Sequence, residues 1–272
     1  MNALGNNRPI GVFDSGIGGL TVVRALMERL PLESIVYFGD TARVPYGVKS
    51  VATIELFTGQ IVDFLLRQEV KMLIVACNTM AAVALKTVTA RAGNISVLDV
   101  IEAGSRAAVN GSGLRGGRIG VIGTPTTINS NAYARRIHAL DPTARVHSQA
   151  CPLFVPLVEE GWLDHPVTRL TAQEYLRPVL AEDVGSLVLG CTHYPLLKPL
   201  LRDVAGEKVK LIDSAETTAE LAATRLREAG LAAGGQEHAI YRYFVTDVPL
   251  RFQTIGERFL GRSLGEVERV DW

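Results

Sequence analysis

Two stretches carry the strongest structural signal in this chain: Leu73-Ile74-Val75-Ala76-Cys77-Asn78-Thr79 and Leu187-Val188-Leu189-Gly190-Cys191-Thr192-His193. Each is a short apolar run that ends in a cysteine and then in small polar residues, which is typical of a buried strand leading into a loop. In open α/β sheets, ligands bind beyond the carboxyl ends of the strands. Two thiols at two equivalent strand ends therefore suggest an acid and a base acting on opposite faces of one substrate.

The bulk composition is that of an ordinary globular protein. The 272 residues, 47% hydrophobic and 21% charged, fit either one large core or two smaller units. The 28 basic and 28 acidic side chains cancel, so charge gives no case for binding nucleic acid or an anionic membrane. Residues 1–9 lack an apolar signal core, no apolar run is long enough to span a bilayer, and three scattered cysteines make no disulfide framework. We therefore expect a cytoplasmic protein with free thiols.

Strand-like runs alternate with amphipathic stretches, which predicts mainly parallel sheet with helices on both faces. The expected strands are 10–13, 35–38, 72–76, 96–99, 118–122, 144–150, 186–190, 209–213 and 240–245. The expected helices include 51–68, 80–91, 127–140 and 168–180.

The order of these elements repeats at an offset of about 110 residues. Four pairs match in the same order: Ile10-Ser15 with Ile119-Thr124, Val44-Pro45 with Val155-Pro156, Cys77 with Cys191, and Leu98-Asp99 with Ile212-Asp213. The matches predict two similar α/β halves related by a pseudo-twofold axis, with the paired thiols facing each other across the interface. By the same offset Cys151 takes the place of Asp40, so it has no partner thiol and is interpreted as structural.

Each residue near the two thiols has both a structural and a functional interpretation. The turn Asp14-Ser15-Gly16-Ile17-Gly18-Gly19 lacks both nucleotide-binding glycine patterns, yet it offers backbone N–H groups suited to a carboxylate. Asp14 could cap a helix or serve a site. Cys77 alone could be an inert core residue, but a position at a helix start would lower the pKa of its thiol. His193 follows Cys191 closely, and histidine is the usual partner that activates a thiol.

Metal and organic cofactors have little support in the sequence. Structural zinc sites use closely spaced ligand pairs, and no such pair is present. None of the six lysines lies at a strand end suited to a pyridoxal Schiff base. We expect neither a metal nor a cofactor.

Five segments together resemble the bacterial glutamate racemases, and they appear in the expected order between Ile10 and Asp213. These are Phe13-Asp14-Ser15-Gly16-Ile17-Gly18-Gly19, Pro45-Tyr46-Gly47, Cys77-Asn78-Thr79, Cys151-Pro152-Leu153-Phe154-Val155-Pro156 and Cys191-Thr192-His193-Tyr194-Pro195. The resemblance implies a cofactor-independent enzyme that interconverts L- and D-glutamate and supplies D-glutamate for peptidoglycan.

The resemblance also implies an architecture. It is α/β, with two similar flavodoxin-like three-layer domains, mainly parallel sheets and the active site between them. The first domain would be discontinuous, comprising residues 1–98 plus 214–272, and the second would be 99–213. Homodimers are usual among such proteins, so we expect one here. The short start before Ile10 lacks the extension of members activated by a cell-wall precursor, so no such activation is expected.

Roles follow from the resemblance residue by residue. Cys77 would act on D-glutamate with help from Asp14, and Cys191 would act on L-glutamate with help from His193 and Glu159. From the residues alone, either Glu159 or Glu160 could orient His193. The substrate's charged groups would be held by Ser15, Pro45, Tyr46, Gly47, Asn78, Thr79, Thr124 and Thr192. One departure stands out, because Pro125-Thr126 replaces a glycine of the commoner pattern beside Thr124.

Two other functions stay open. A related two-thiol enzyme such as an aspartate racemase would differ mainly in pocket length. A two-lobed module that binds an amino acid without converting it is the other alternative, although such a module has no need of two matched thiols.

Overall fold

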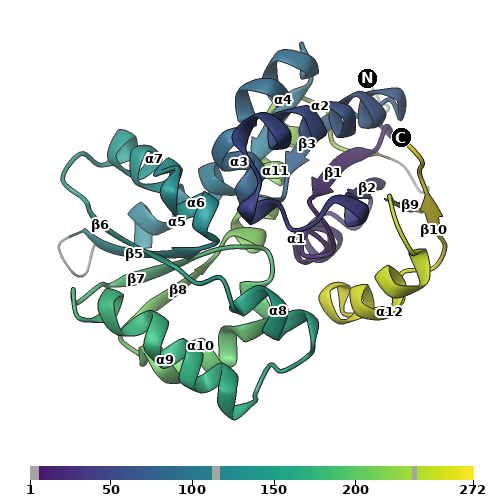
Figure 1. Ribbon diagram of the computed structural model, residues 1–272. Helices are drawn as coiled ribbons and strands as arrows, with labels where there is room; N and C mark the ends of the chain where they lie inside the picture. The colour runs from purple at the N-terminus through teal and green to yellow at the C-terminus, as the bar shows by residue number, and fades with distance from the viewer. Residues whose placement is uncertain (1–5, 112–116, 235–237) are drawn as a thin grey trace.

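A computed structural model describes residues 6–111, 117–234 and 238–272, and Figure 1 shows two sheets lying side by side. The six-stranded sheet has the order β10-β9-β2-β1-β3-β4, and the four-stranded sheet has the order β6-β5-β7-β8. All pairings in both sheets are parallel. The strands are β1 Ile10–Asp14, β2 Ile35–Gly39, β3 Met72–Val75, β4 Ser96–Asp99, β5 Arg118–Gly123, β6 Arg145–Ala150, β7 Ser186–Gly190, β8 Lys210–Asp213, β9 Tyr241–Val245 and β10 Val267–Arg269.

These sheets confirm the predicted α/β class with two mainly parallel sheets. All nine expected strands form, with ends that differ from the predicted ones by about a residue. The order β2-β1-β3-β4 in one sheet equals β6-β5-β7-β8 in the other, so the duplication seen in the sequence is a duplication of topology. The short edge strand β10 was not predicted.

Helices flank both sheets. They are α1 Leu20–Arg29, α2 Val51–Arg67, α3 Asn78–Val83, α4 Leu85–Ala92, α5 Val100–Gly111, α6 Pro125–Asn129, α7 Ala132–Leu140, α8 Phe154–Glu159, α9 Pro166–Leu180, α10 Lys198–Ala205, α11 Ser214–Glu228 and α12 Pro249–Leu260. Two predicted helices, 80–91 and 127–140, are each divided into two. The first breaks at Ala84, and the second begins earlier, at Pro125, and breaks at Ser130 and Asn131.

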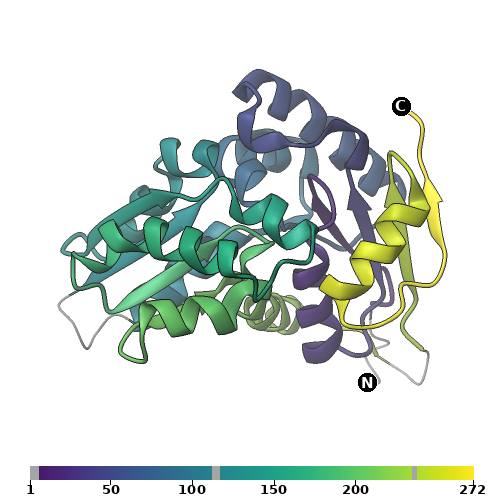
Figure 2. The same cartoon turned by 60° about the horizontal axis from the view of Figure 1, so that its bottom comes forward.

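The chain returns to the first sheet after it completes the second. Strands β9 and β10 extend the six-stranded sheet beyond β2, and α12 lies near them in Figures 1 and 2. Helix α11 packs against both α1 and α5 as the chain crosses back. This path is compatible with a discontinuous first domain, but the predicted boundaries stay a prediction, and β4 runs one residue past the first of them.

The central strands of both sheets are buried, and this position sets where functional side chains emerge. Strands β1, β3 and β7 are buried along their whole length, as their continuous apolar sequences predict. Because the strands of each sheet run parallel, their carboxyl ends share one edge. Asp14, Cys77 and Cys191 all lie at such edges.

Candidate active site

Cys77 lies just beyond β3, where it is the N-cap residue of α3. The thiol is buried and donates to Ser15 Oγ over 3.5 Å. Burial and the nearby Asp14 carboxylate raise the pKa of Cys77 to about 12. The expectation that the helix start would lower this pKa is therefore wrong, because desolvation outweighs the favourable amide groups of the short helix α3. At neutral pH Cys77 is a thiol.

Asp14 is the last residue of β1 and is almost fully buried beside Cys77. Burial raises its pKa, while the charge of His193 and the backbone N–H groups of Gly19 and Gly16 oppose that rise. The Gly16 N–H donates to Oδ2 over 3.2 Å, whereas Oδ1 is buried without a hydrogen-bond partner among the described residues. Asp14 thus interacts both with Cys77, in the lobe built on the six-stranded sheet (the first lobe), and with His193, in the lobe built on the four-stranded sheet (the second lobe).

Cys191 follows β7 and forms a chain of contacts with His193 and Glu159. The Cys191 sulfur lies 3.9 Å from His193 Nδ1, and His193 Nε2 lies 3.0 Å from Glu159 Oε1, at the end of α8. Burial lowers the pKa of His193, but hydrogen bonds to Cys191 and Glu159 outweigh it and bring the pKa to about 10. His193 is therefore an imidazolium at neutral pH, and Glu159 rather than Glu160 is the carboxylate that orients it.

Polar side chains of α3, the helix that starts beside Cys77, contact α7 and the start of α6. Asn78 Oδ1 accepts a hydrogen bond of 2.7 Å from Tyr133, while its Nδ2 is buried with no partner among the described residues. Thr79 Oγ1 lies 3.1 Å from Thr124 Oγ1 and 3.4 Å from Thr127 Oγ1. The amide donor of Asn78 is thus available to a ligand. Tyr133 and Thr127 were not predicted, although Thr127 belongs to the same threonine-rich turn as Thr124.

The turns after β1 and β7 pack directly against each other. A Cβ placed on Gly18 would lie 2.2 Å from Thr192 Oγ1 and 2.5 Å from His193 Nδ1. Thr21 Oγ1 also donates to the Thr192 carbonyl over 3.2 Å. Only a glycine at position 18 allows this approach, which sets the Cys191 turn against the Asp14 turn.

The segment that follows β2 contributes less directly to the candidate active site. The Tyr46 hydroxyl donates to Asp40, so it is committed to a structural contact. Thr126 Oγ1 donates to the Gly47 carbonyl over 2.6 Å, so the unusual Pro125-Thr126 pair supplies a link between the lobes. Pro45, which follows a cis peptide bond, is exposed, and the contacts of residues 6–111, 117–234 and 238–272 do not place it at either thiol.

Cys151 sits apart from this arrangement. It is fully buried, its thiol contacts the Gln149 carbonyl at 3.7 Å, and its own carbonyl accepts a hydrogen bond from Tyr194. Burial and the charge on Cys191 raise the pKa of Cys151 well above the ordinary range. A neutral, immobile thiol is what the structural interpretation of Cys151 requires.

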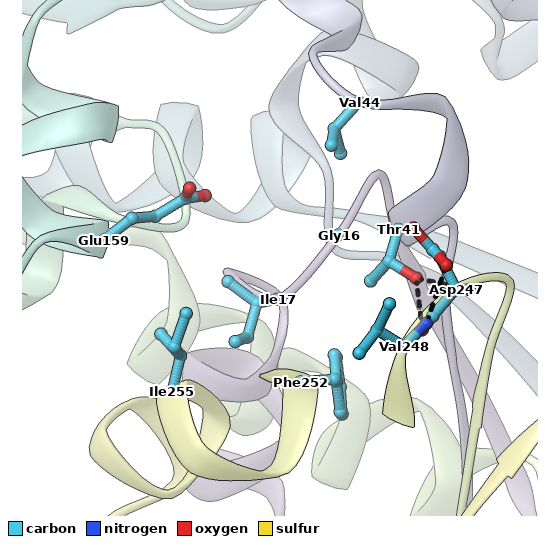
Figure 3. Close-up of a pocket in the computed structure, with 9 residues that line it drawn as sticks. All are labelled: Gly16, Ile17, Thr41, Val44, Glu159, Asp247, Val248, Phe252 and Ile255. Carbon is cyan, nitrogen blue, oxygen red and sulfur yellow. Dashed lines mark hydrogen bonds between the residues drawn. The ribbon is translucent and has the colours of Figure 1, made fainter. Parts of the chain in front are cut away.

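A pocket of about 160 Å³ lies beside the site. Figure 3 shows Glu159 entering it from α8, with the turn after β1 and the side chains of α12 on the other sides. Its lining is Gly16, Ile17, Thr41, Val44, Glu159, Asp247, Val248, Phe252 and Ile255. The pocket therefore borders both lobes.

The described residues contain neither a membrane-spanning helix nor a cluster of metal ligands. None of their helices is long and apolar enough to cross a membrane. Within the same ranges, histidine, cysteine and carboxylate side chains form no group of three or more that could hold a metal ion.

A sequence model of the Asp/Glu/hydantoin racemases matches residues 20–222, which include both paired cysteines. The chain belongs to this family. The racemase is 68% identical to the glutamate racemase of Syntrophus aciditrophicus over 262 residues, or 96% of each chain.

Solved structures agree with that relationship. The racemase superposes on the glutamate racemase of Francisella tularensis in complex with D-glutamate with a TM-score of 0.91 and 46% identity, covering 97% and 98% of the two chains. A glutamate racemase isoform from Bacillus anthracis gives a TM-score of 0.93 and 42% identity over 98% of each chain. Similarity therefore extends over nearly the whole racemase, including α12, which lies outside residues 20–222.

Proposed function

We propose that this chain interconverts L- and D-glutamate by transfer of the α-proton between two cysteines, without a cofactor. The observation that carries the proposal is the facing pair of strand-end turns with unequal thiols. Cys77 is held as a neutral thiol beside Asp14, whereas Cys191 lies next to a charged His193. Relatives named glutamate racemase at 68% and 60% identity support glutamate as the substrate.

In each direction of the reaction, one cysteine removes the α-proton and the other donates a proton. The imidazolium of His193 stabilises Cys191 as a thiolate, which removes the α-proton of L-glutamate. Cys77 then delivers its own proton to the opposite face of the carbanion, giving D-glutamate, a Cys77 thiolate and a Cys191 thiol. D-glutamate follows the reverse path from the opposite protonation state, in which Asp14 has accepted the proton of Cys77 and His193 has given a proton to Cys191. Exchange with solvent restores the starting protonation.

The remaining polar groups would hold the substrate in register between the thiols. The buried Nδ2 of Asn78 is a donor suited to a carboxylate, and the cluster of Thr79, Thr124 and Thr127 supplies hydroxyls. Ser15 and Thr192 lie beside the two thiols. Tyr46 and Gly47 would contribute through their backbone, since the Tyr46 hydroxyl already donates to Asp40. Fixed donors of this kind also stabilise charge that develops on the substrate.

The proposal also covers the biological role, the location, the oligomeric state and the domain organisation of the protein. D-glutamate made in this way would supply peptidoglycan synthesis, in the cytoplasm, from a homodimer whose first domain comprises residues 1–98 and 214–272. Gel filtration with light scattering tests the dimer directly, and a mass of one chain would contradict it.

Racemisation by the purified protein tests the activity. L-glutamate treated with enzyme in EDTA, without pyridoxal phosphate, should lose its circular dichroism signal. Faster loss with L-aspartate would instead favour an aspartate racemase, and no loss with either would favour a binding module. Cys77→Ser and Cys191→Ser should each reduce turnover about 100-fold or more. Cys151→Ser is the matched control and should retain the parental rate.

A further inference from the structure

Helix α12 supplies two adjacent side chains to the Cys191 half of the site. Arg258 Nη1 donates to the carbonyl oxygens of Val158 and Glu159, each over 3.3 Å. The next residue, Phe259, meets the His193 ring edge to face, with centroids 5.1 Å apart at 80°. One helix of the first lobe therefore contacts both members of the Glu159–His193 pair, which belong to the second lobe.

The turn after α8 is shaped to receive the Arg258 guanidinium. Gly161 has a φ of +78°, and a Cβ placed there would lie 2.9 Å from Arg258 Nη1. The Gly161 N–H also donates to the Val158 carbonyl over 3.0 Å, so Arg258 shares that acceptor. A cation at the carboxyl end of a helix interacts favourably with the exposed carbonyl groups. The contact thus fixes the last turn of α8, which carries Glu159.

Helix α12, which carries Arg258, is itself closely packed against the first lobe. A Cβ on Gly256 would lie 2.8 Å from Leu20 Cδ1 and 2.7 Å from Leu264 Cδ1, so the helix lies close against the start of α1. Phe252 and Phe259 are buried on the same side. Figure 1 shows α12 beside α8, where the two lobes meet. Arg258 therefore contacts the second lobe from α12, a helix that is packed against the first lobe.

We propose that Arg258 is a positioning residue, which holds the end of α8 so that Glu159 keeps His193 oriented toward Cys191. The proposal rests on the proposed two-thiol racemisation. Loss of Arg258 should therefore slow the proton transfer at Cys191 and leave the proton transfer at Cys77 unchanged. It also predicts little change in KM, because the hydrogen bonds that Arg258 makes among the described residues are to the end of α8 and not to the substrate-binding groups of α3.

Substrate isotope effects can show which thiol is impaired. The two enantiomers have equal free energy, so kcat/KM must remain equal in both directions in any variant, and rates alone cannot identify the side. When transfer at Cys191 becomes harder, that step limits the rate more. The isotope effect with 2-deuterio-L-glutamate then rises, while that with 2-deuterio-D-glutamate falls.

The experiment compares the parent with Arg258→Met, Arg258→Lys and Arg262→Met in the full chain. Arg258→Met should lower kcat about threefold to tenfold with KM nearly constant, and should raise the L-side isotope effect while lowering the D-side one. Arg258→Lys keeps a cation and should recover part of the loss. Arg262→Met, which removes an exposed arginine just past the end of α12, is the matched control and should behave as the parent.

Two results would overturn the role of Arg258. One is an Arg258→Met enzyme with parental isotope effects, and the other is an equal change on both sides, which indicates general loosening of the fold. An inactive parent would overturn the proposed function instead, so the two failures are distinguishable. Arg258 is exposed, so loss of folding in the variant is not expected, and far-UV circular dichroism checks this.

Discussion

At the scale of single residues, the two thiols are unequal because their surroundings stabilise different charges. Cys77 and Cys191 are similarly buried, with exposed fractions of 5% and 7%. Cys77 faces the Asp14 carboxylate, which disfavours a thiolate, whereas Cys191 lies 3.9 Å from Nδ1 of the charged His193 ring. The difference in chemistry therefore comes from neighbours and not from access.

Alkylation measures this difference directly. Because the thiolate is the reacting form, the raised pKa of Cys77 should make its labelling by iodoacetamide at pH 7.5 at least about tenfold slower than that of Cys191. The rate at Cys77 should rise about tenfold per pH unit from 7 to 9, since its pKa of about 12 lies above that window. Peptide mass spectrometry gives both rates from one sample. Faster labelling of Cys77 than of Cys191, or a rate at Cys77 that does not change with pH, would contradict the assignment of Cys77 as a neutral thiol.

At the scale of elements, the site depends on close contact between the turns after β1 and β7. Gly18 lies where any Cβ would meet Thr192 and His193. Small errors in the placement of reacting groups cost large factors in rate.

Gly18→Ala should therefore lower racemisation about 100-fold, since the added methyl displaces His193 from Cys191. Gly111→Ala is a suitable control, because its Cβ would approach the flexible Lys210 side chain at 3.3 Å and Ile212 Cδ1 at an ordinary contact distance of 3.5 Å. Steady-state rates and thermal melting of both variants separate a local effect from a loss of stability. Near-parental activity in Gly18→Ala would show that the turns can move apart without harm.

The sequence predicted the strands well and the details of the helices less well. Strands such as β3 and β7 are continuous apolar runs, and their burial follows from that pattern. The division of 80–91 depends on tertiary packing around the fully buried Ala84, which periodicity does not reveal. The position of Glu159 was predicted by resemblance, but its choice over Glu160 needed the distance to His193 Nε2.

At the scale of the whole molecule, two similar sheets each bring one cysteine to a shared junction. The repeat in the sequence predicted this pairing, and the matching strand orders confirm the duplicated topology. It could not predict α12, which has no counterpart in the second half and brings Arg258 and Phe259 to the junction. Such long-range contacts leave no periodic signal in the chain.

The central claim is that two different thiols act on opposite faces of one α-carbon. It is tested most directly by converting L-glutamate in heavy water and stopping the reaction early. Two thiols predict that the D-glutamate formed carries deuterium at the α-carbon, delivered from Cys77, while the remaining L-glutamate keeps protium. D-glutamate that retains the α-proton of its substrate would show a single acid–base group serving both faces, and would contradict the account.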